Sequence, residues 1–200
     1  MSFTEDELEQ AYLEILEELG WEHIDGRHME REDYHEVILE ENLRNAVYSL
    51  NKNMPTSAKE EAIRKVLYLS NSNLIKTNEE FHKMFTEGVD IGEHIDKDKI
   101  KRSGGKVYLV DFENINNNEF LAINQFTIVG NSKRRPDILL YINGIPVVVI
   151  ELKSLSNDSV GIKEAFTQIE RYKFEIPKLF NYNSFCIISD GVNAKAGTIS

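Results

Sequence analysis

Two acidic side chains and one lysine stand at the ends of two neighbouring apolar runs. Asp137 precedes the first run, and Glu151 and Lys153 end the second. Two carboxylates held close together repel each other, and their oxygens suit a hard divalent cation such as Mg²⁺. The backbone carbonyl of Leu152 could complete the ligand set together with water molecules. The Lys153 ammonium could orient a water molecule and offset negative charge in a transition state, so these residues predict metal-dependent phosphodiester hydrolysis.

The register of a hairpin decides whether these three side chains meet. Asn143-Gly144, between the two runs, is a strong signal for a tight β-turn. Glu151 and Lys153 are two residues apart on a strand and therefore share a face. A strict two-residue turn would put Asp137 on the opposite face from Glu151, whereas a three-residue loop or a bulge would put both acids on one face. The catalytic interpretation therefore requires an odd loop or a bulge.

A purely structural interpretation competes with the catalytic one. About one Glu-x-Lys is expected by chance in a chain of this length, and an acid at the end of a strand is usually solvated. However, Glu151 and Lys153 directly continue the apolar run 145–150, which predicts a strand covered on both faces. Charges that follow a buried run need either solvent at a cleft or each other as partners. Gln168 and Tyr172 share a helix face, either as a half-buried amphipathic pair or as polar groups leaning over the catalytic end of the hairpin.

The elements around these residues change in character along the chain. Residues 1–90 are predicted to be mainly helical, because potential capping boxes accompany apolar residues at helical spacing. These boxes are Thr4/Glu7, Asp33/Glu36, Ser57/Glu60 and Thr77/Glu80. Residues 91–106 are polar and rich in glycine, which predicts a loop. Residues 107–200 contain several β-type runs and one helical stretch over 160–175, and are predicted to form the catalytic core of an α/β fold.

The net charge of −11 is unevenly distributed. Residues 1–50 carry fifteen acidic and three basic side chains, whereas residues 51–200 carry nineteen acidic and twenty basic ones. The later part of the chain can therefore meet a polyanion locally. The triplet Lys133-Arg134-Arg135 beside Asp137 could hold phosphates without reading bases, whereas Lys101-Arg102 is explained equally well as a solvated loop. The acidic N-terminal helices are expected to face away from a bound polyanion or to meet protein.

Several other kinds of site are excluded by the sequence. The single cysteine, Cys186, cannot support a disulfide framework, and its apolar surroundings suggest a reduced core residue of a cytoplasmic protein. No apolar run approaches the length of a membrane span, and the acidic start lacks the features of a signal peptide. The sequence contains neither a His-Glu-x-x-His zinc motif nor a phosphate-binding P-loop. The chain stops shortly after a predicted core strand, which suggests a fragment of a longer polypeptide.

Asp137, Glu151-x-Lys153 and Gln168-x-x-x-Tyr172, in this order, resemble the PD-(D/E)xK nuclease superfamily, in its RecB-like branch. Longer strings over residues 118–126, 135–137, 143–146 and 189–191 resemble, more narrowly, the N-terminal nuclease domain of the type I restriction enzyme R subunit. The resemblance extends over nearly the whole chain. It implies a restriction-endonuclease-like fold, in which helices flank a mixed central sheet and an N-terminal helical subdomain is added.

The same resemblance implies roles for the residues already named. Asp137 and Glu151 would bind Mg²⁺, Lys153 would be catalytic, and Gln168 and Tyr172 would support the site or contact DNA. A glutamate of the first helix often assists the metal in these folds. Glu9 is the candidate for that role, and its competitors are Glu5, Glu7 and Glu14.

The resemblance also implies partners. The domain would cleave unmodified double-stranded DNA after translocation by a helicase-like motor of the same polypeptide, beyond residue 200, where ATP would bind. It would work in a complex with modification and specificity subunits. Two alternatives remain open from the sequence, namely a stand-alone nuclease or resolvase of the same superfamily, and a catalytically silent domain that docks onto another protein.

Overall fold

The computed structural model describes residues 4–69, 73–96, 101–154 and 160–199. The chain divides into two compact units. The first unit comprises residues 1–37, 120–141 and 146–200, and the second comprises residues 38–119 and 142–145. The first unit therefore combines the N-terminal segment with the part that carries the predicted catalytic residues. This division differs from the expected one, in which residues 1–90 formed a helical part of their own.

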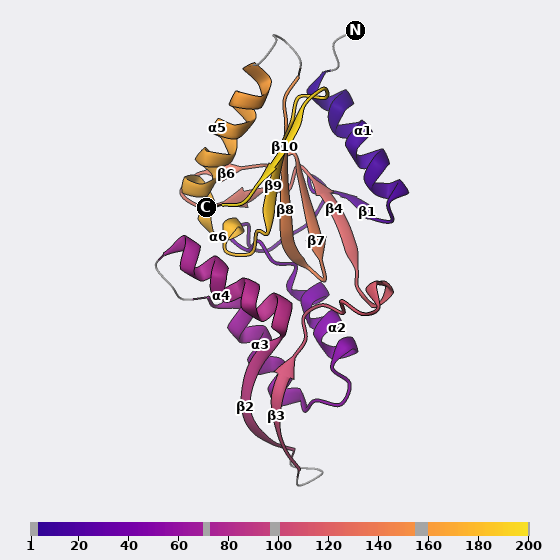
Figure 1. The fold of residues 1–200 in the computed structure, drawn as a ribbon, viewed down its shortest axis with the longest axis vertical. Helices are drawn as coiled ribbons and strands as arrows, with labels where there is room; N and C mark the ends of the chain where they lie inside the picture. Colours follow the sequence, from indigo (N-terminus) through magenta and orange to yellow (C-terminus); the bar gives the residue numbers. More distant parts are fainter. Residues whose placement is uncertain (1–3, 70–72, 97–100, 155–159, 200) are drawn as a thin grey trace. The chain divides into compact units, whose positions relative to one another are not determined.

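A mixed sheet forms the centre of the first unit (Figure 1). Its order is β1 (Glu22–Asp25), β4 (Phe120–Asn124), β7 (Ile138–Ile142), β8 (Ile145–Leu152), β9 (Phe185–Ser189) and β10 (Ala194–Gly197). β1 runs parallel to β4, β8 runs parallel to β9, and β9 and β10 are antiparallel. Helices flank this sheet, which confirms the predicted restriction-endonuclease-like α/β fold.

The strand β8 is buried along its whole length. Its apolar residues 145–150 were expected to be covered on both faces, and all of them are buried. Each such Val or Ile contributes about 1.5–3 kcal/mol relative to an exposed position. The parallel pairing with β9 brings Glu151 opposite Ile188 and Leu152 opposite Ser189. The acid at the end of β8 is therefore held by one of the most firmly packed segments of the unit.

The described part of the first unit contains the helices α1 (Glu5–Glu18), α5 (Val160–Glu175) and α6 (Pro177–Phe180). In Figure 1, α1 and α5 lie on opposite sides of the central strands. The capping box at the start of α1 is formed, because the Glu7 N–H donates to Thr4 Oγ1 at 3.2 Å and the Thr4 N–H donates to Glu7 Oε2 at 2.8 Å. The range of α5 agrees with the helix predicted over residues 160–175.

A small two-stranded sheet of β5 (Ile128–Val129) and β6 (Lys133–Arg134) completes the first unit among the described residues. Among the described strands of this unit, β1, β6 and β10 were not expected from the sequence. β1 follows α1 directly, and β10 is an exposed edge strand. Cys186 is a free, buried thiol in β9, and burial raises its pKa to about 12.

The second unit consists of α2 (Glu40–Leu50), α3 (Thr56–Leu67), α4 (Leu74–Glu87), β2 (Val89–Asp96), β3 (Lys101–Val107) and the 3₁₀ turn η1 (Ile115–Asn117). Its core includes Leu43, Val47, Ile63, Val66 and Phe81. The prediction of a loop over residues 91–106 is wrong, because β2 and β3 pair there as an antiparallel hairpin. Glycine and polar residues interrupt the apolar alternation of this hairpin, of which the buried Val89, Ile91 and Val107 remain.

Only one of the four expected capping boxes caps a helix in the described residues. No helix follows Asp33, whose carboxylate accepts from the His35 N–H instead. The helix α3 begins one residue before Ser57, and Thr77 lies inside α4, whose N-cap is Asn73. The spacing of a capping box is therefore too common to locate a helix start by itself. Over the described residues, no helix has both the length and the apolar character needed to cross a membrane.

Candidate active site

The turn between β7 and β8 has the tight two-residue form. Asn143 and Gly144 both adopt a positive φ, at 52° and 77°, which is the type I′ geometry expected for Asn-Gly. A Cβ on Gly144 would stand 2.4 Å from the Leu39 carbonyl oxygen, so this position requires glycine. The turn is therefore not an odd loop, which was one of the two arrangements expected to bring both acids to one face.

The two acids approach each other in another way. Asp137 lies just before β7 begins, and its Oδ2 accepts a hydrogen bond of 2.7 Å from the Leu152 N–H. The Asp137 backbone carbonyl accepts from the Gln125 N–H at 3.0 Å, which fixes the residue from the other side. Because the carboxylate bonds to the backbone at the end of β8, it comes close enough to Glu151 for its charge to act on that residue. The carboxylate of Asp137 therefore reaches the end of β8 although the turn contains no extra residue.

Glu151 and Lys153 form a partly buried ion pair. Glu151 Oε1 lies 2.9 Å from Lys153 Nζ, and their side chains are 2% and 20% exposed. Lys153 Nζ also donates to the Leu152 carbonyl at 2.9 Å. The other carboxylate oxygen of Glu151, Oε2, is buried and accepts no hydrogen bond within the described residues. A buried carboxylate oxygen without a donor is costly and indicates a site for a cation or an ordered water molecule.

The pKa values of Asp137 and Glu151 are both raised toward neutral pH. Burial raises the pKa of Asp137 to about 6, although the Leu152 N–H and the Lys153 charge act in the opposite direction. Burial and the negative charge of Asp137 raise the pKa of Glu151 to about 7. Burial lowers the pKa of Lys153, but Glu151 and Asp137 outweigh it, so the net shift is upward and the ammonium stays charged. Two neighbouring carboxyl groups share a single ammonium, so a further positive charge would stabilise their ionised forms.

The residues at this point fit a hard divalent cation in the nature of their donors. Asp137, Glu151 and the Leu152 carbonyl present only oxygen atoms, which Mg²⁺ and Ca²⁺ prefer. In the parts of the chain that the structure describes, no three His, Cys, Asp or Glu side chains gather as a ready-made ligand set. Two carboxylates and a carbonyl would therefore leave most of the shell to water and substrate, as is usual for Mg²⁺.

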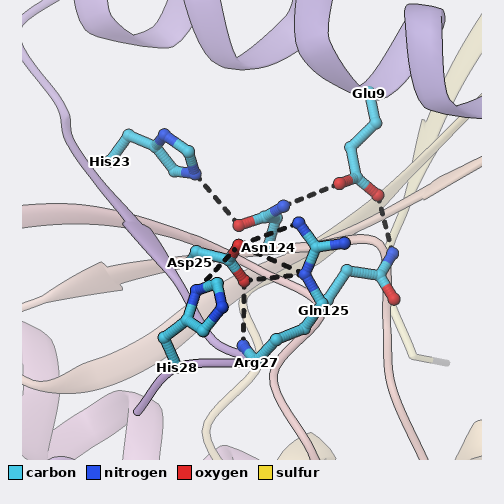
Figure 2. Close-up of polar contacts among 7 residues, drawn as sticks. All are labelled: Glu9, His23, Asp25, Arg27, His28, Asn124 and Gln125. Atoms are coloured by element: carbon cyan, nitrogen blue, oxygen red, sulfur yellow. Dashed lines mark hydrogen bonds and ion pairs between the residues drawn. The ribbon is translucent and has the colours of Figure 1, made fainter.

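Glu9, the expected assisting glutamate, is oriented by two amides (Figure 2). Its Oε1 accepts from Asn124 Nδ2 and its Oε2 accepts from Gln125 Nε2, both at 2.7 Å. Asn124 is itself bonded to His23 at 3.0 Å. The charge of Glu9 acts on Asp137, where it favours protonation. The neighbouring ion pair of Asp25 and Arg27, also drawn in Figure 2, lowers the pKa of Asp25 to about 2.

The competing glutamates of α1 have other surroundings. Glu5 Oε1 lies 3.7 Å from Lys153 Nζ, and the negative charge of Glu5 contributes to the raised pKa of Asp137. Glu7 caps the helix, and Glu14 is exposed. Glu5 and Glu9 are one helical turn apart, so α1 turns two acids toward the end of β8. The amides that hold Glu9 were not singled out from the sequence, although Asn124-Gln125 directly follows an apolar strand.

The basic triplet and the Gln168/Tyr172 pair line a common hollow. Its volume is about 400 Å³, and its lining comprises Gln125, Lys133, Arg134, Arg135, Gln168 and Tyr172. Tyr172 is 3% exposed, and burial together with the charge of Glu151 raises its pKa. The hollow therefore joins the predicted supporting residues to the predicted phosphate-binding residues next to the acid pair.

Within the triplet, Arg134 differs from its neighbours. Its guanidinium forms a two-point ion pair with Glu175 at the end of α5, with Nη2 2.5 Å from Oε1 and Nε bonded to Oε2. The Asn131 N–H donates to the Glu175 carbonyl at 2.7 Å, and Asn131 Nδ2 donates to the Phe174 carbonyl at 2.8 Å. The β5–β6 hairpin is thereby fixed to α5. Lys133 and Arg135 are exposed, and the side chains of Lys101-Arg102 lie outside the described residues.

Comparison with known proteins identifies the family. The family described as type I restriction enzyme R protein N terminus matches residues 2–200. The chain belongs to this family. It is 38% identical, over 98% of its length, to the type I restriction enzyme HindI endonuclease subunit of Haemophilus influenzae. It is 31% identical, over 96% of its length, to the putative type I restriction enzyme MjaIXP endonuclease subunit of Methanocaldococcus jannaschii.

The chain spans 19% of the length of each of these two relatives. Membership of the R protein N-terminus family agrees with the resemblance inferred from the motifs. In this family member, the acid pair, the lysine and the Gln168/Tyr172 pair all belong to the first unit. The geometry can hold a cation, present an ammonium beside it and admit a phosphate from the hollow.

Proposed function

We propose that this domain is a Mg²⁺-dependent DNA endonuclease. The observation that carries the proposal is the buried Glu151 carboxylate, whose Oε1 pairs with Lys153 and whose Oε2 accepts no hydrogen bond among the described residues. Asp137, Glu151 and the Leu152 carbonyl would hold Mg²⁺. The bound ion would polarise a phosphoryl oxygen and lower the pKa of a water molecule. The names of the relatives, as endonuclease subunits, support the same reaction class.

The protein side chains have separate tasks in this reaction. Lys153 orients the attacking water molecule and offsets the negative charge that develops on the scissile phosphate. Asp137 is kept in position by the Leu152 N–H, and Glu9 by the amides of Asn124 and Gln125. Tyr172 packs beside Glu151, where it shields the acid from bulk water. Lys133 and Arg135 hold the DNA backbone without reading its sequence.

In the whole protein, the domain would act within a larger assembly. The two relatives are about five times longer than the stretch matched here, since that stretch is 19% of each. We propose that the longer polypeptide carries an ATP-driven motor that moves double-stranded DNA, and that modification and specificity subunits choose the target. The cytoplasm, with its reduced thiols, would be the compartment, in agreement with the free Cys186.

The proposal is tested by Lys153→Ala in the full-length protein. Loss of the ammonium should lower the rate of DNA cutting by about 10²–10³-fold. The ATPase rate of the motor and the melting temperature serve as controls, and both should stay near wild type. Cutting at the wild-type rate by Lys153→Ala would contradict the assignment. It would then favour a domain whose role is to dock onto another protein.

A further inference from the structure

We infer that a second basic arm, formed by Lys163 and Arg171 of α5, binds the phosphate backbone of DNA on the opposite side of Gln168 from the basic triplet. This inference rests on the proposed nuclease function and deepens it. The triplet alone would hold DNA on one side of the acid pair. With the second arm, the DNA backbone is held in both hollows that Gln168 borders.

Two adjoining hollows carry the inference. The first contains the triplet and has Gln168 and Tyr172 in its wall. The second has a volume of about 350 Å³ and is lined by Lys153, Lys163, Glu164, Thr167, Gln168 and Arg171. Gln168 belongs to both linings, so the hollows meet at this residue. Because Lys153 lines the second hollow, a strand that crosses Gln168 passes the proposed catalytic lysine.

The charge of these linings is opposite to that of the chain. The net charge of the protein is −11, yet the two linings contain six basic side chains and one acid, Glu164. Arg134 is paired with Glu175, and Lys153 is paired with Glu151. Within the described residues, the other four basic side chains form no ion pair, and they are Lys133, Arg135, Lys163 and Arg171. Unpaired cations concentrated in a groove attract a polyanion.

The helix fixes the spacing within the second arm. Lys163, Thr167 and Arg171 succeed each other at intervals of four residues, so they follow one face of α5. Eight residues of helix separate the two cations by about 12 Å along the axis. This distance corresponds to between three and four base steps at about 3.4 Å each. Lys163 and Arg171 can therefore contact different phosphates of the same duplex.

The first arm is fixed to the same helix. The ion pair of Arg134 with Glu175 and the bonds of Asn131 to the last carbonyls of α5 hold the β5–β6 hairpin. Both arms thus depend on one rigid element. A duplex held by both would have its position defined relative to Gln168, which borders both hollows. Contacts to the DNA backbone define the position of the duplex and carry no base specificity, as expected of a nuclease whose target is chosen by other subunits.

The test compares the salt dependence of DNA binding. The double variant Lys163→Gln/Arg171→Gln is made in the full-length protein and titrated with a duplex in the presence of a chelator, so that no cutting occurs. Removal of two phosphate contacts should reduce the slope of log affinity against log salt by about 1.8. Lys195→Gln, which removes an exposed lysine of β10 outside both linings, is the matched control and should leave the slope unchanged. Glu164→Gln, which removes the acid from the lining, should bind DNA a few-fold more tightly.

The outcomes separate the second arm from the proposed function. A slope of the double variant equal to that of wild type overturns the second arm, as does an equal loss in Lys195→Gln. Asp137→Asn, measured in parallel, should retain the wild-type slope and lose cutting. If Asp137→Asn still cuts, the proposed function fails whatever the slopes show. Both residues of the second arm are exposed, so the melting temperature of the double variant should equal that of wild type. Each single variant should show half of the change in slope that the double variant shows.

Discussion

The Asp137 carboxylate accepts a hydrogen bond of 2.7 Å from the backbone N–H of Leu152. This bond links the residue before one strand of the hairpin to the end of the other. It brings the carboxyl group close enough to Glu151 for its charge to act on that residue. The two acids can therefore meet across a strict type I′ turn, because one of them reaches in from outside the ladder.

Asp137→Asn should separate folding from catalysis. An asparagine side chain still presents an oxygen to the Leu152 N–H, so the hairpin end should stay in place. The negative charge that raises the pKa of Glu151 is lost, so that pKa should fall. We expect a melting temperature equal to or above that of wild type, together with a loss of Mg²⁺-dependent cutting. A large drop in melting temperature would show that the carboxylate serves mainly to hold the fold.

The stability of the metal-free protein should depend on pH through the acid pair. The pKa values of about 6 for Asp137 and about 7 for Glu151 lie above the ordinary values of 3.8 and 4.5. The folded state therefore binds these two protons more tightly than the unfolded chain does. The corresponding stabilisation is fully present below the ordinary pKa values and is lost as the pH rises through 6 and 7.

Thermal denaturation in a chelator, across this pH range, measures the effect. Glu151→Gln removes one of the two groups with a raised pKa, so its melting temperature should fall less steeply with pH than that of wild type. Added Mg²⁺ should raise the melting temperature most at the alkaline end, where both acids are charged. Parallel pH profiles for wild type and Glu151→Gln would contradict the assigned pKa shifts.

Glu9 should matter more than its neighbours in α1. Asn124 and Gln125 each donate to one carboxylate oxygen of Glu9. Glu9→Gln replaces one of these oxygens by an NH₂ group, so one donor loses its acceptor and the negative charge is lost. We expect the Mg²⁺ concentration needed for half-maximal cutting to rise by about 10-fold or more. Glu14→Gln, an exposed change in the same helix, is the control and should have no effect. Equal behaviour of the two variants would remove Glu9 from the site.

The ion pair between Arg134 and Glu175 should position the first basic arm. Arg134→Ala should weaken DNA binding more than the loss of one phosphate contact explains, because the hairpin with Lys133 and Arg135 loses its attachment to α5. Denaturant unfolding of the single variants and of the charge-exchanged pair Arg134→Glu/Glu175→Arg should show that the two positions are coupled, with the exchanged pair recovering part of the stability that each single variant loses. Additive effects in this cycle would assign Arg134 to direct DNA contact instead.

The sequence by itself determined the identity of the chemical groups and the elements that carry them. The turn at Asn143-Gly144, the buried run 145–150 and the helix over residues 160–175 are set by local conformational preference and hydrophobic pattern, and the structure contains all three. The hairpin of β2 and β3 escaped prediction because glycine and polar residues interrupt its apolar alternation, so among the described residues only its outer end shows a buried face.

Only the tertiary structure decided how these groups meet. Strand periodicity left the face of Asp137 open, because it depends on the hairpin register, and the structure shows this side chain bonding to Leu152 from just outside β7. The amides that hold Glu9 and the acid that holds Arg134 lie more than a hundred and about forty residues away from their partners, respectively. Such contacts arise from the packing of α1 and α5 around one sheet, and no local pattern in the chain encodes them.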